Sequence, residues 1–398
     1  MSKKDRNPRV LQIEPPEHRF NYLIAPNGDW LASADGSTMH LQGYVDDQAI
    51  WNIDDGGFCH VATGLKLEAT LTEIGRRCQL RLSGTDVAAD GTTGDASDFI
   101  IGQGPEKLPS QYLKSLRQDG YVSLACILSA EIVDGLQMVG CVEEYEGNKP
   151  GKDHPIAMDA SVLQATIEPV SLWLTQQYMQ HCDIRLGHPP SVTSLPPDDG
   201  KREVTGWHTD YPYLQGTGDR IGASGNLVLG MQCNTCVSDF KVENGATMFK
   251  LGSHVEEAGP NTEWGVTNNT VMPGHRKKHG LPYSGEEATV IEAPAGSMVL
   301  YDARTWHCAG LNQTNRRRGA MIQAFVPGYI MPFMDTSAAF KAFLESDVIN
   351  DVTERQLLEL EKLMLFEING PRGQHAITTD SDLTRRVRAR GTSQELNY

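Results

Sequence analysis

The residues best suited to chemistry lie in one short segment near the middle of the chain, Gly206-Trp-His-Thr-Asp-Tyr-Pro212. His208 and Asp210 are two residues apart, so on an extended strand their side chains point to the same face. An imidazole and a carboxylate that converge in this way supply two ligands of a 2-His-1-carboxylate metal site. The pair alone is a weak signal, because a histidine hydrogen-bonded to a nearby aspartate is a common structural feature.

A second motif, 97 residues after Asp210, supplies the missing ligand. Residues 295–302 predict a turn followed by an apolar strand, and His307 comes directly after that strand. His307 could therefore return to the site as the third ligand.

Three consecutive arginines occupy positions 316–318, and Arg318, eleven residues after His307, lies on what should be the next, antiparallel strand. A guanidinium there offers a planar fork that holds a carboxylate through two parallel hydrogen bonds. By alternation, Arg316 and Arg318 share one face of the strand while Arg317 points away. On geometry alone, either Arg316 or Arg318 could hold the carboxylate.

Together these motifs resemble the phytanoyl-CoA dioxygenase-like branch of the Fe(II)/2-oxoglutarate-dependent oxygenases. Four segments match in chain order: His208-Thr-Asp210, Glu243-Asn-Gly-Ala-Thr-Met-Phe-Lys-Leu-Gly-Ser-His254, the block from Gly296 through Asp302 and His307 to Asn312, and Arg318 at the family spacing. The resemblance covers about residues 107 to 335. Two positions depart from the family pattern: Leu251 replaces a proline, and Ala309 replaces a frequent serine near the co-substrate.

The resemblance implies an all-β core with flanking helices, folded as a double-stranded β-helix, the cupin-like jelly roll. It further implies that His208, Asp210 and His307 hold Fe(II), and that Arg318 binds the distal carboxylate of the co-substrate 2-oxoglutarate. With O2, such enzymes release succinate and CO2 and oxidise a small-molecule substrate such as a biosynthetic intermediate. Hydroxylation is the default outcome, with desaturation and cyclisation as variants, and the presence of Asp210 favours oxygenation over halogenation.

The segments outside this match suggest three parts. Residues 1–105 predict a β-rich extension of unknown role, 106–335 the oxygenase domain with its helical lead-in, and 336–398 a C-terminal helix and basic tail. Within them we predict a helix over 111–118 and one continuous helix over 160–181. A capping box at Thr353 and Gln356 predicts the start of another.

Other reactive side chains have simpler interpretations. His254 is expected to be structural, and His275 and His279 to lie in a solvated loop. Cys233 and Cys236 lie in a predicted strand, which favours packed cysteines over a redox or zinc site. Three aromatics near the ligands could line the pocket or belong to the core: Tyr211, Tyr213 and Trp306.

Composition narrows the class of protein. With 35 Lys and Arg against 51 Asp and Glu, the net charge of −16 disfavours nucleic-acid binding. No apolar run reaches the roughly 18 residues of a membrane span, and no signal peptide is visible, so we predict no membrane partner and a cytoplasmic location. A homodimer stays open. Two alternatives also stay open at this point: a cupin-type isomerase or hydrolase that does not use 2-oxoglutarate, and a catalytically silent jelly-roll binding protein.

Overall fold

The computed structural model describes residues 8–36, 39–54, 57–71, 77–81, 98–140, 142, 154–201, 206–213, 227–256, 258–264, 267 and 288–364. The predicted loop histidines 275 and 279 and the basic tail lie outside these residues. Among the described residues, no helix is both long and apolar enough to cross a bilayer.

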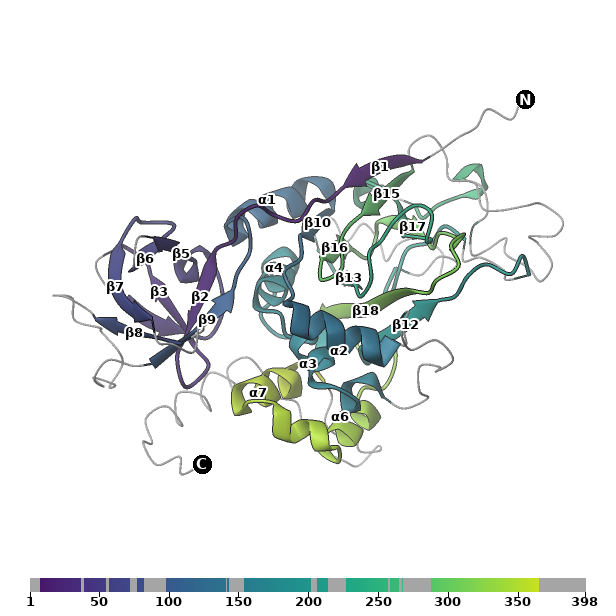
Figure 1. Cartoon of the computed structure of the whole chain (residues 1–398). Helices are drawn as coiled ribbons and strands as arrows, with labels where there is room; N and C mark the ends of the chain where they lie inside the picture. Colours follow the sequence, from purple (N-terminus) through teal and green to yellow (C-terminus); the bar gives the residue numbers. More distant parts are fainter. Residues whose placement is uncertain are drawn as a thin grey trace.

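Two facing β-sheets form the core of the C-terminal two thirds of the chain (Figure 1). The first sheet has the strand order β1 (Arg9–Gln12), β15 (Thr289–Glu292), β14 (Met248–Lys250), β17 (Trp306–Cys308). The second has the order β10 (Tyr121–Leu124), β16 (Met298–Asp302), β13 (Met231–Cys236), β18 (Arg318–Pro327), β11 (Ile184–Leu186), with β12 (Ser191–Leu195) also paired to β18. Phe249 and Ile291 of the first sheet pack against Val299 and Tyr301 of the second.

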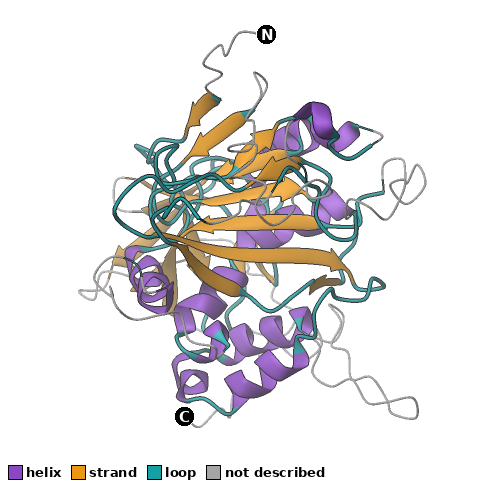
Figure 2. Cartoon of the chain, turned by 90° about the vertical axis from the view of Figure 1, so that its right-hand side faces the viewer, coloured by secondary structure: helices purple, strands orange, loops and turns teal. Residues whose placement is uncertain are grey.

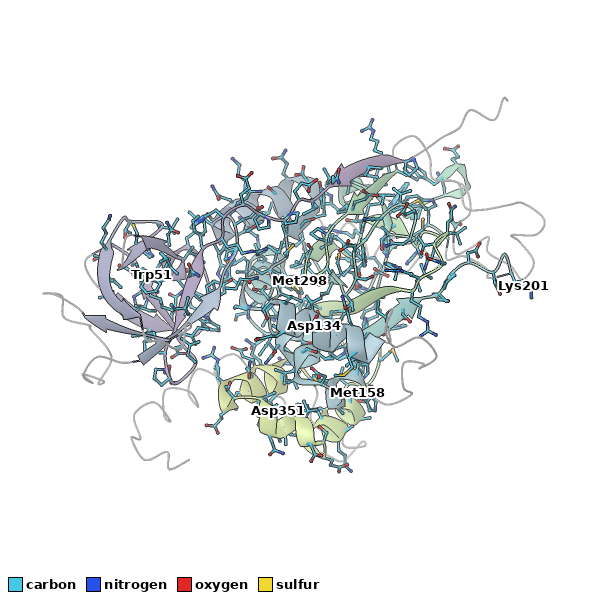
Figure 3. All side chains as sticks on the ribbon, viewed as in Figure 1. Trp51, Asp134, Met158, Lys201, Met298 and Asp351 are labelled. Carbon is cyan, nitrogen blue, oxygen red and sulfur yellow. The ribbon has the colours of Figure 1, made fainter. Side chains whose placement is uncertain are left out.

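Helices cover the outer face of the second sheet, as Figure 2 shows below the longest strand. They are α1 (Pro109–Asp119), α2 (Ala130–Gly140), α3 (Ala160–Thr166), α4 (Pro169–Met179), α6 (Ser337–Leu344) and α7 (Glu354–Leu363), with short 3-10 turns at Asp47–Ala49, Pro155–Ala157, Ser253–Val255, Thr262–Trp264 and Asp347–Asp351. Met298, Leu300 and Phe325 point from the sheet into this helical layer, and Met298 lies near the centre of the molecule in Figure 3. This confirms an all-β core with flanking helices.

The helix predictions hold with one exception. Residues 111–118 lie in α1, which ends at Gly120 with φ 75°, and Thr353 and Gln356 form the capping box of α7. The single helix over 160–181 is wrong, because the chain breaks into α3 and α4 at Glu168-Pro169. Pro169 has no N–H to continue a helix but suits its first turn, and the Glu168 carboxylate accepts hydrogen bonds from the next two backbone amides.

The buried cap Glu168 predicts a pH-dependent stability. Burial raises the pKa of Glu168 to about 7, above the usual glutamate value of 4.5. Between these two pH values the folded protein therefore keeps a proton that the unfolded chain has released. The contribution of Glu168 to the free energy of unfolding is therefore fully present below pH 4.5 and is lost as the pH rises through 7. Relative to Glu168→Gln, the wild-type free energy of unfolding should fall by on the order of 3 kcal/mol across this range. Urea unfolding of both proteins at pH 5 and pH 8 measures the change, and parallel curves would contradict it.

The N-terminal strands form a separate sheet, seen at the left of Figure 1. Its order is β4 (Met39–Gln42), β3 (Trp30–Ser33), β2 (Asn21–Ile24), β5 (Trp51–Asp54), β6 (Gly57–His60), β7 (Lys66–Leu71), β8 (Arg77–Arg81), β9 (Asp98–Gln103), and β9 pairs back with β2. Trp51 is fully buried inside it (Figure 3). The division at residue 105 stays a prediction, to which β1 is an exception because it pairs in parallel with β15 of the other unit.

Arg355 of α7 joins this N-terminal sheet to the helices. Its guanidinium contacts Asp29 at 2.6 Å, the backbone oxygen of Gly43 at 2.6 Å and Glu359 at 2.6 Å. The arginine is only 7% exposed. A buried charge with three partners of this kind holds the two units in one orientation.

Candidate metal centre

His208 and His307 lie directly opposite each other at the edge of the first sheet. Their backbones exchange both hydrogen bonds, at 3.0 and 3.1 Å, as a hydrogen-bonded antiparallel pair does. Residues opposite each other in such a pair project to the same face, and the two imidazole centroids are 4.2 Å apart. Asp210, two residues after His208, projects to that face as well. The chain thus brings the three predicted ligands together, with their donor atoms within 4.8 Å of one another.

Both histidines present the same nitrogen to Asp210. Nε2 of His208 lies 3.6 Å from Oδ1 of the carboxylate, and Nε2 of His307 lies 3.1 Å from Oδ2. Each Nδ1 instead contacts the backbone oxygen two residues earlier, at 2.8 Å for Gly206 and 2.9 Å for Thr305. A backbone oxygen that accepts a hydrogen bond from Nδ1–H favours the tautomer in which Nε2 offers its lone pair to a metal, which is the usual arrangement of ligating histidines.

Burial and mutual proximity set the charges of the three groups. Burial, followed by the neighbouring His307, lowers the pKa of His208 to about 4, so this imidazole is neutral at neutral pH. Burial would also lower the pKa of His307, but the attraction and hydrogen bond of Asp210 outweigh it and raise that pKa. Burial would raise the pKa of Asp210, yet the nearby histidines lower it overall. The carboxylate is therefore ionised, as a cation ligand must be.

A tight turn at residues 302–305 positions two of the three ligands. The backbone oxygen of Ala303 accepts a hydrogen bond from the Asp210 amide at 2.8 Å, and that of Thr305 contacts His307 Nδ1. The fully buried Asp302 carboxylate holds the turn together. It accepts hydrogen bonds from Arg304 at 2.6, 2.8 and 2.9 Å and from the Tyr178 hydroxyl of α4 at 2.9 Å.

From the role of this turn we predict that Asp302→Asn weakens metal binding, although Asp302 is not one of the three candidate ligands. Asparagine keeps the shape but breaks the buried ion pair with Arg304, which is expected to lower the free energy of unfolding by about 3 kcal/mol. The backbone oxygens of Ala303 and Thr305 would then orient the ligands less firmly, and the Fe(II) affinity should fall about tenfold. This is the low end of the losses seen when a group that orients a ligand is removed. Tyr178→Phe, which removes one hydrogen bond, should cost about 1 kcal/mol and leave the affinity unchanged. Anaerobic Fe(II) titrations and urea unfolding of both variants measure this, and an unchanged affinity in Asp302→Asn would contradict it.

Of the clustered arginines, only Arg318 is buried. It is 8% exposed, whereas Arg316 is exposed and Arg317 half-buried. The pairing of the strands shows which face of the sheet Arg318 lies on. Ala324 of β18 lies opposite Gln232, and Gln232 lies opposite Tyr301. The even-numbered residues of β18, Arg318 among them, therefore share the inward face of Tyr301. The Arg318 guanidinium lies on that side, 4.5 Å from the centre of the Phe240 ring. Burial, a tertiary property, separates Arg318 from Arg316.

The other reactive residues from the sequence lie apart from this cluster. His254 is buried against Gly120, and Cys233 and Cys236 are buried free thiols within β13, which confirms their packing role. Trp306 belongs to the outer face of the first sheet, where it packs on Trp264. Tyr213 is likewise buried, and its hydroxyl accepts a hydrogen bond from the Leu229 amide.

Two groups near the centre were not expected from the sequence. Tyr301 is fully buried, its ring lies 5.1 Å from that of His307, and the charge of Asp210 acts on its hydroxyl. Burial first, and then the Asp210 charge, raise the pKa of this phenol, so it stays protonated beside the carboxylate. His188 adds to the positive field that lowers the Asp210 pKa. In the sequence, Tyr301 lies in the apolar run before His307, which is typical of a core residue. Only the tertiary structure shows that it lies beside His307 and Asp210.

The comparison with protein families decides the kinship of the chain. The model of the phytanoyl-CoA dioxygenase family matches residues 116–320, just over half of the sequence. The chain belongs to the phytanoyl-CoA dioxygenase family. Members of this dioxygenase family have the double-stranded β-helix fold, so the predicted jelly roll is confirmed. The protein is a non-haem iron enzyme that depends on 2-oxoglutarate, which replaces the two alternatives left open above.

Three solved structures that are similar to this dioxygenase-family chain are distant from it in sequence. HygX from Streptomyces hygroscopicus, with nickel and 2-oxoglutarate bound, is 14% identical over 69% of this chain and 98% of its own, with a TM-score of 0.43. The epimerase SnoN, in complex with Fe3+, alpha ketoglutarate and nogalamycin RO, is 15% identical over 68% and 94%, with a TM-score of 0.39. EvdO2 from Micromonospora carbonacea var. aurantiaca is 17% identical over 56% and 92%, with a TM-score of 0.40. No curated protein matches the chain by sequence.

The residues of this family member fit the iron that the family uses. Two imidazole nitrogens and one carboxylate are the facial donor set of non-haem Fe(II) enzymes. Both nitrogens are held in the ligating tautomer by backbone oxygens. The ring of Tyr301 further packs on His307 from the side of the core.

Proposed function

We propose that this chain is an oxygenase that hydroxylates a small-molecule substrate, such as a biosynthetic intermediate, with release of succinate and CO2. The single observation that carries the proposal is the convergence of His208, Asp210 and His307 on one face, with donor atoms within 4.8 Å. In this assignment these three side chains hold Fe(II). When bound with 2-oxoglutarate and O2, the iron supplies the oxidising power that removes a hydrogen from the substrate.

The protein's own part is to bind, orient and shield. His208 and His307 would each offer Nε2 to the iron, because their Nδ1–H groups donate to the backbone oxygens of Gly206 and Thr305. Asp210 supplies the negative charge and is oriented by the Ala303 oxygen through its backbone amide. The buried, inward-facing Arg318 is the group that binds the distal carboxylate of 2-oxoglutarate through two parallel hydrogen bonds.

Anaerobic titration tests this assignment. Purified, metal-free protein should bind one Fe(II), and addition of 2-oxoglutarate should produce a weak visible metal-to-ligand charge-transfer band. The matched variant is His307→Ala, with His181→Ala as a control because His181 packs on Tyr329, outside the cluster. A band of wild-type intensity in His307→Ala would overturn the ligand assignment. Absence of the band in the wild-type protein would overturn the proposed function.

A further inference from the structure

The segment that follows β18 presents four large apolar side chains to solvent within six residues. Tyr329 is 60% exposed, Met331 65%, Phe333 56% and Met334 53%. We call these four residues, together with Tyr211, the apolar rim. No charged side chain occurs between residues 327 and 334, although the chain as a whole carries a net charge of −16.

The apolar rim is held in place rather than merely exposed. Ile330 is anchored in a small cluster with Tyr213, Leu229 and the fully buried Ala303. The Tyr211 hydroxyl donates to the backbone oxygen of Met331 at 2.7 Å, and the rings of Tyr211 and Phe333 lie 5.6 Å apart.

Further contacts fix both ends of the segment. The Met334 amide donates to the Gly187 oxygen at 2.9 Å, and the ring of Tyr329 packs on that of His181 at 5.2 Å. Fixed, solvent-exposed apolar groups of this kind mark a binding surface.

The anchors of the rim are also parts of the metal centre. Tyr211 directly follows Asp210, and Ala303, which supports Ile330, holds the Asp210 amide. The centre is also most open at this point, because the Asp210 side chain is 22% exposed against 15% for His208 and 8% for His307. The rim is thus joined to the centre at Asp210, the ligand whose side chain is most exposed.

The chemistry of the rim defines what it fits. Aromatic faces favour stacking with flat rings, and methionine side chains adapt to irregular apolar shapes and contact aromatic rings favourably. We infer that the apolar rim is the substrate-docking surface of the metal centre and that the substrate carries an uncharged, ring-containing apolar body. This inference rests on the proposed function, since it takes the cluster of His208, Asp210 and His307 as the reaction centre.

An uncharged naphthalene dye, N-phenyl-naphthylamine, tests the inference with the full chain. Its fluorescence should rise on binding to the wild-type protein, and Phe333→Ser and Met331→Ser should each weaken binding about tenfold. Met138→Ser is the matched control, because Met138 is 43% exposed on α2 and should leave binding unchanged. These surface changes leave the core intact, so loss of folding does not explain a loss of binding.

Metal loading then tests whether the bound dye faces the centre. Paramagnetic Co(II) in the His208, Asp210 and His307 cluster should quench the bound dye, whereas Zn(II) should not. Dye binding that is absent, or equal in Phe333→Ser and wild type, overturns the inference. Bound Co(II) that leaves the dye fluorescence unchanged also overturns the inference. A further contradiction would be a wild-type dimer in sedimentation that dissociates in Phe333→Ser, because a second copy of the chain would then occupy the rim. If the absorption spectrum shows that Co(II) does not bind at all, the proposed function itself fails.

Discussion

Replacing Asp210 by alanine is expected to reduce Fe(II) affinity by more than about 100-fold and to abolish 2-oxoglutarate turnover. This loss of affinity is larger than the roughly 10- to 100-fold loss caused by removing a group that only orients a ligand, because here the ligand itself is removed. The carboxylate is also the only anionic group of the three, so its removal leaves two imidazoles and no negative charge to attract the cation. Anaerobic equilibrium dialysis with Fe(II) measures the affinity, and succinate formation measures turnover.

The matched control is Asp134→Ala on the exposed surface of α2, which removes the same charge away from the cluster. It should bind Fe(II) as the wild-type protein does. Folding of Asp210→Ala is checked by urea unfolding of the metal-free protein. If folded Asp210→Ala bound Fe(II) with wild-type affinity, the cluster would not be the iron site.

Replacing Arg318 by lysine is expected to weaken 2-oxoglutarate binding about 10- to 100-fold while leaving Fe(II) affinity unchanged. Lysine keeps the positive charge but cannot form two parallel hydrogen bonds to one carboxylate. One lost charge-assisted hydrogen bond costs about 1.5–3 kcal/mol, which corresponds to that range of affinities. The intensity of the charge-transfer band, titrated with 2-oxoglutarate, gives the dissociation constant.

Arg316→Lys is the control for this experiment, because Arg316 lies two residues away but is exposed. It should bind 2-oxoglutarate normally. The reverse pattern, with Arg316→Lys impaired and Arg318→Lys normal, would move the carboxylate site to the other arginine. Equal, unimpaired binding in both variants would show that neither arginine holds the co-substrate.

The parts predicted best from the sequence are those fixed by local rules. Side-chain alternation on a strand places His208 and Asp210 on one face whatever the rest of the chain does. The capping box at Thr353 is equally local, and it occurs as predicted. The helix over 160–181 failed because the apolar spacing continues across Glu168-Pro169, while the missing amide and the cap end one helix and start another.

By itself, therefore, the sequence determined which three side chains are the candidate metal ligands, the jelly-roll class and the kinship with the dioxygenase family, since residue types and spacing carry that information. Only the tertiary structure decided that Arg318 rather than Arg316 is buried, that Asp302 braces the turn before His307, and that β1 crosses to the first sheet. Burial and long-range pairing depend on residues distant in the chain. Alternation along one strand cannot report them.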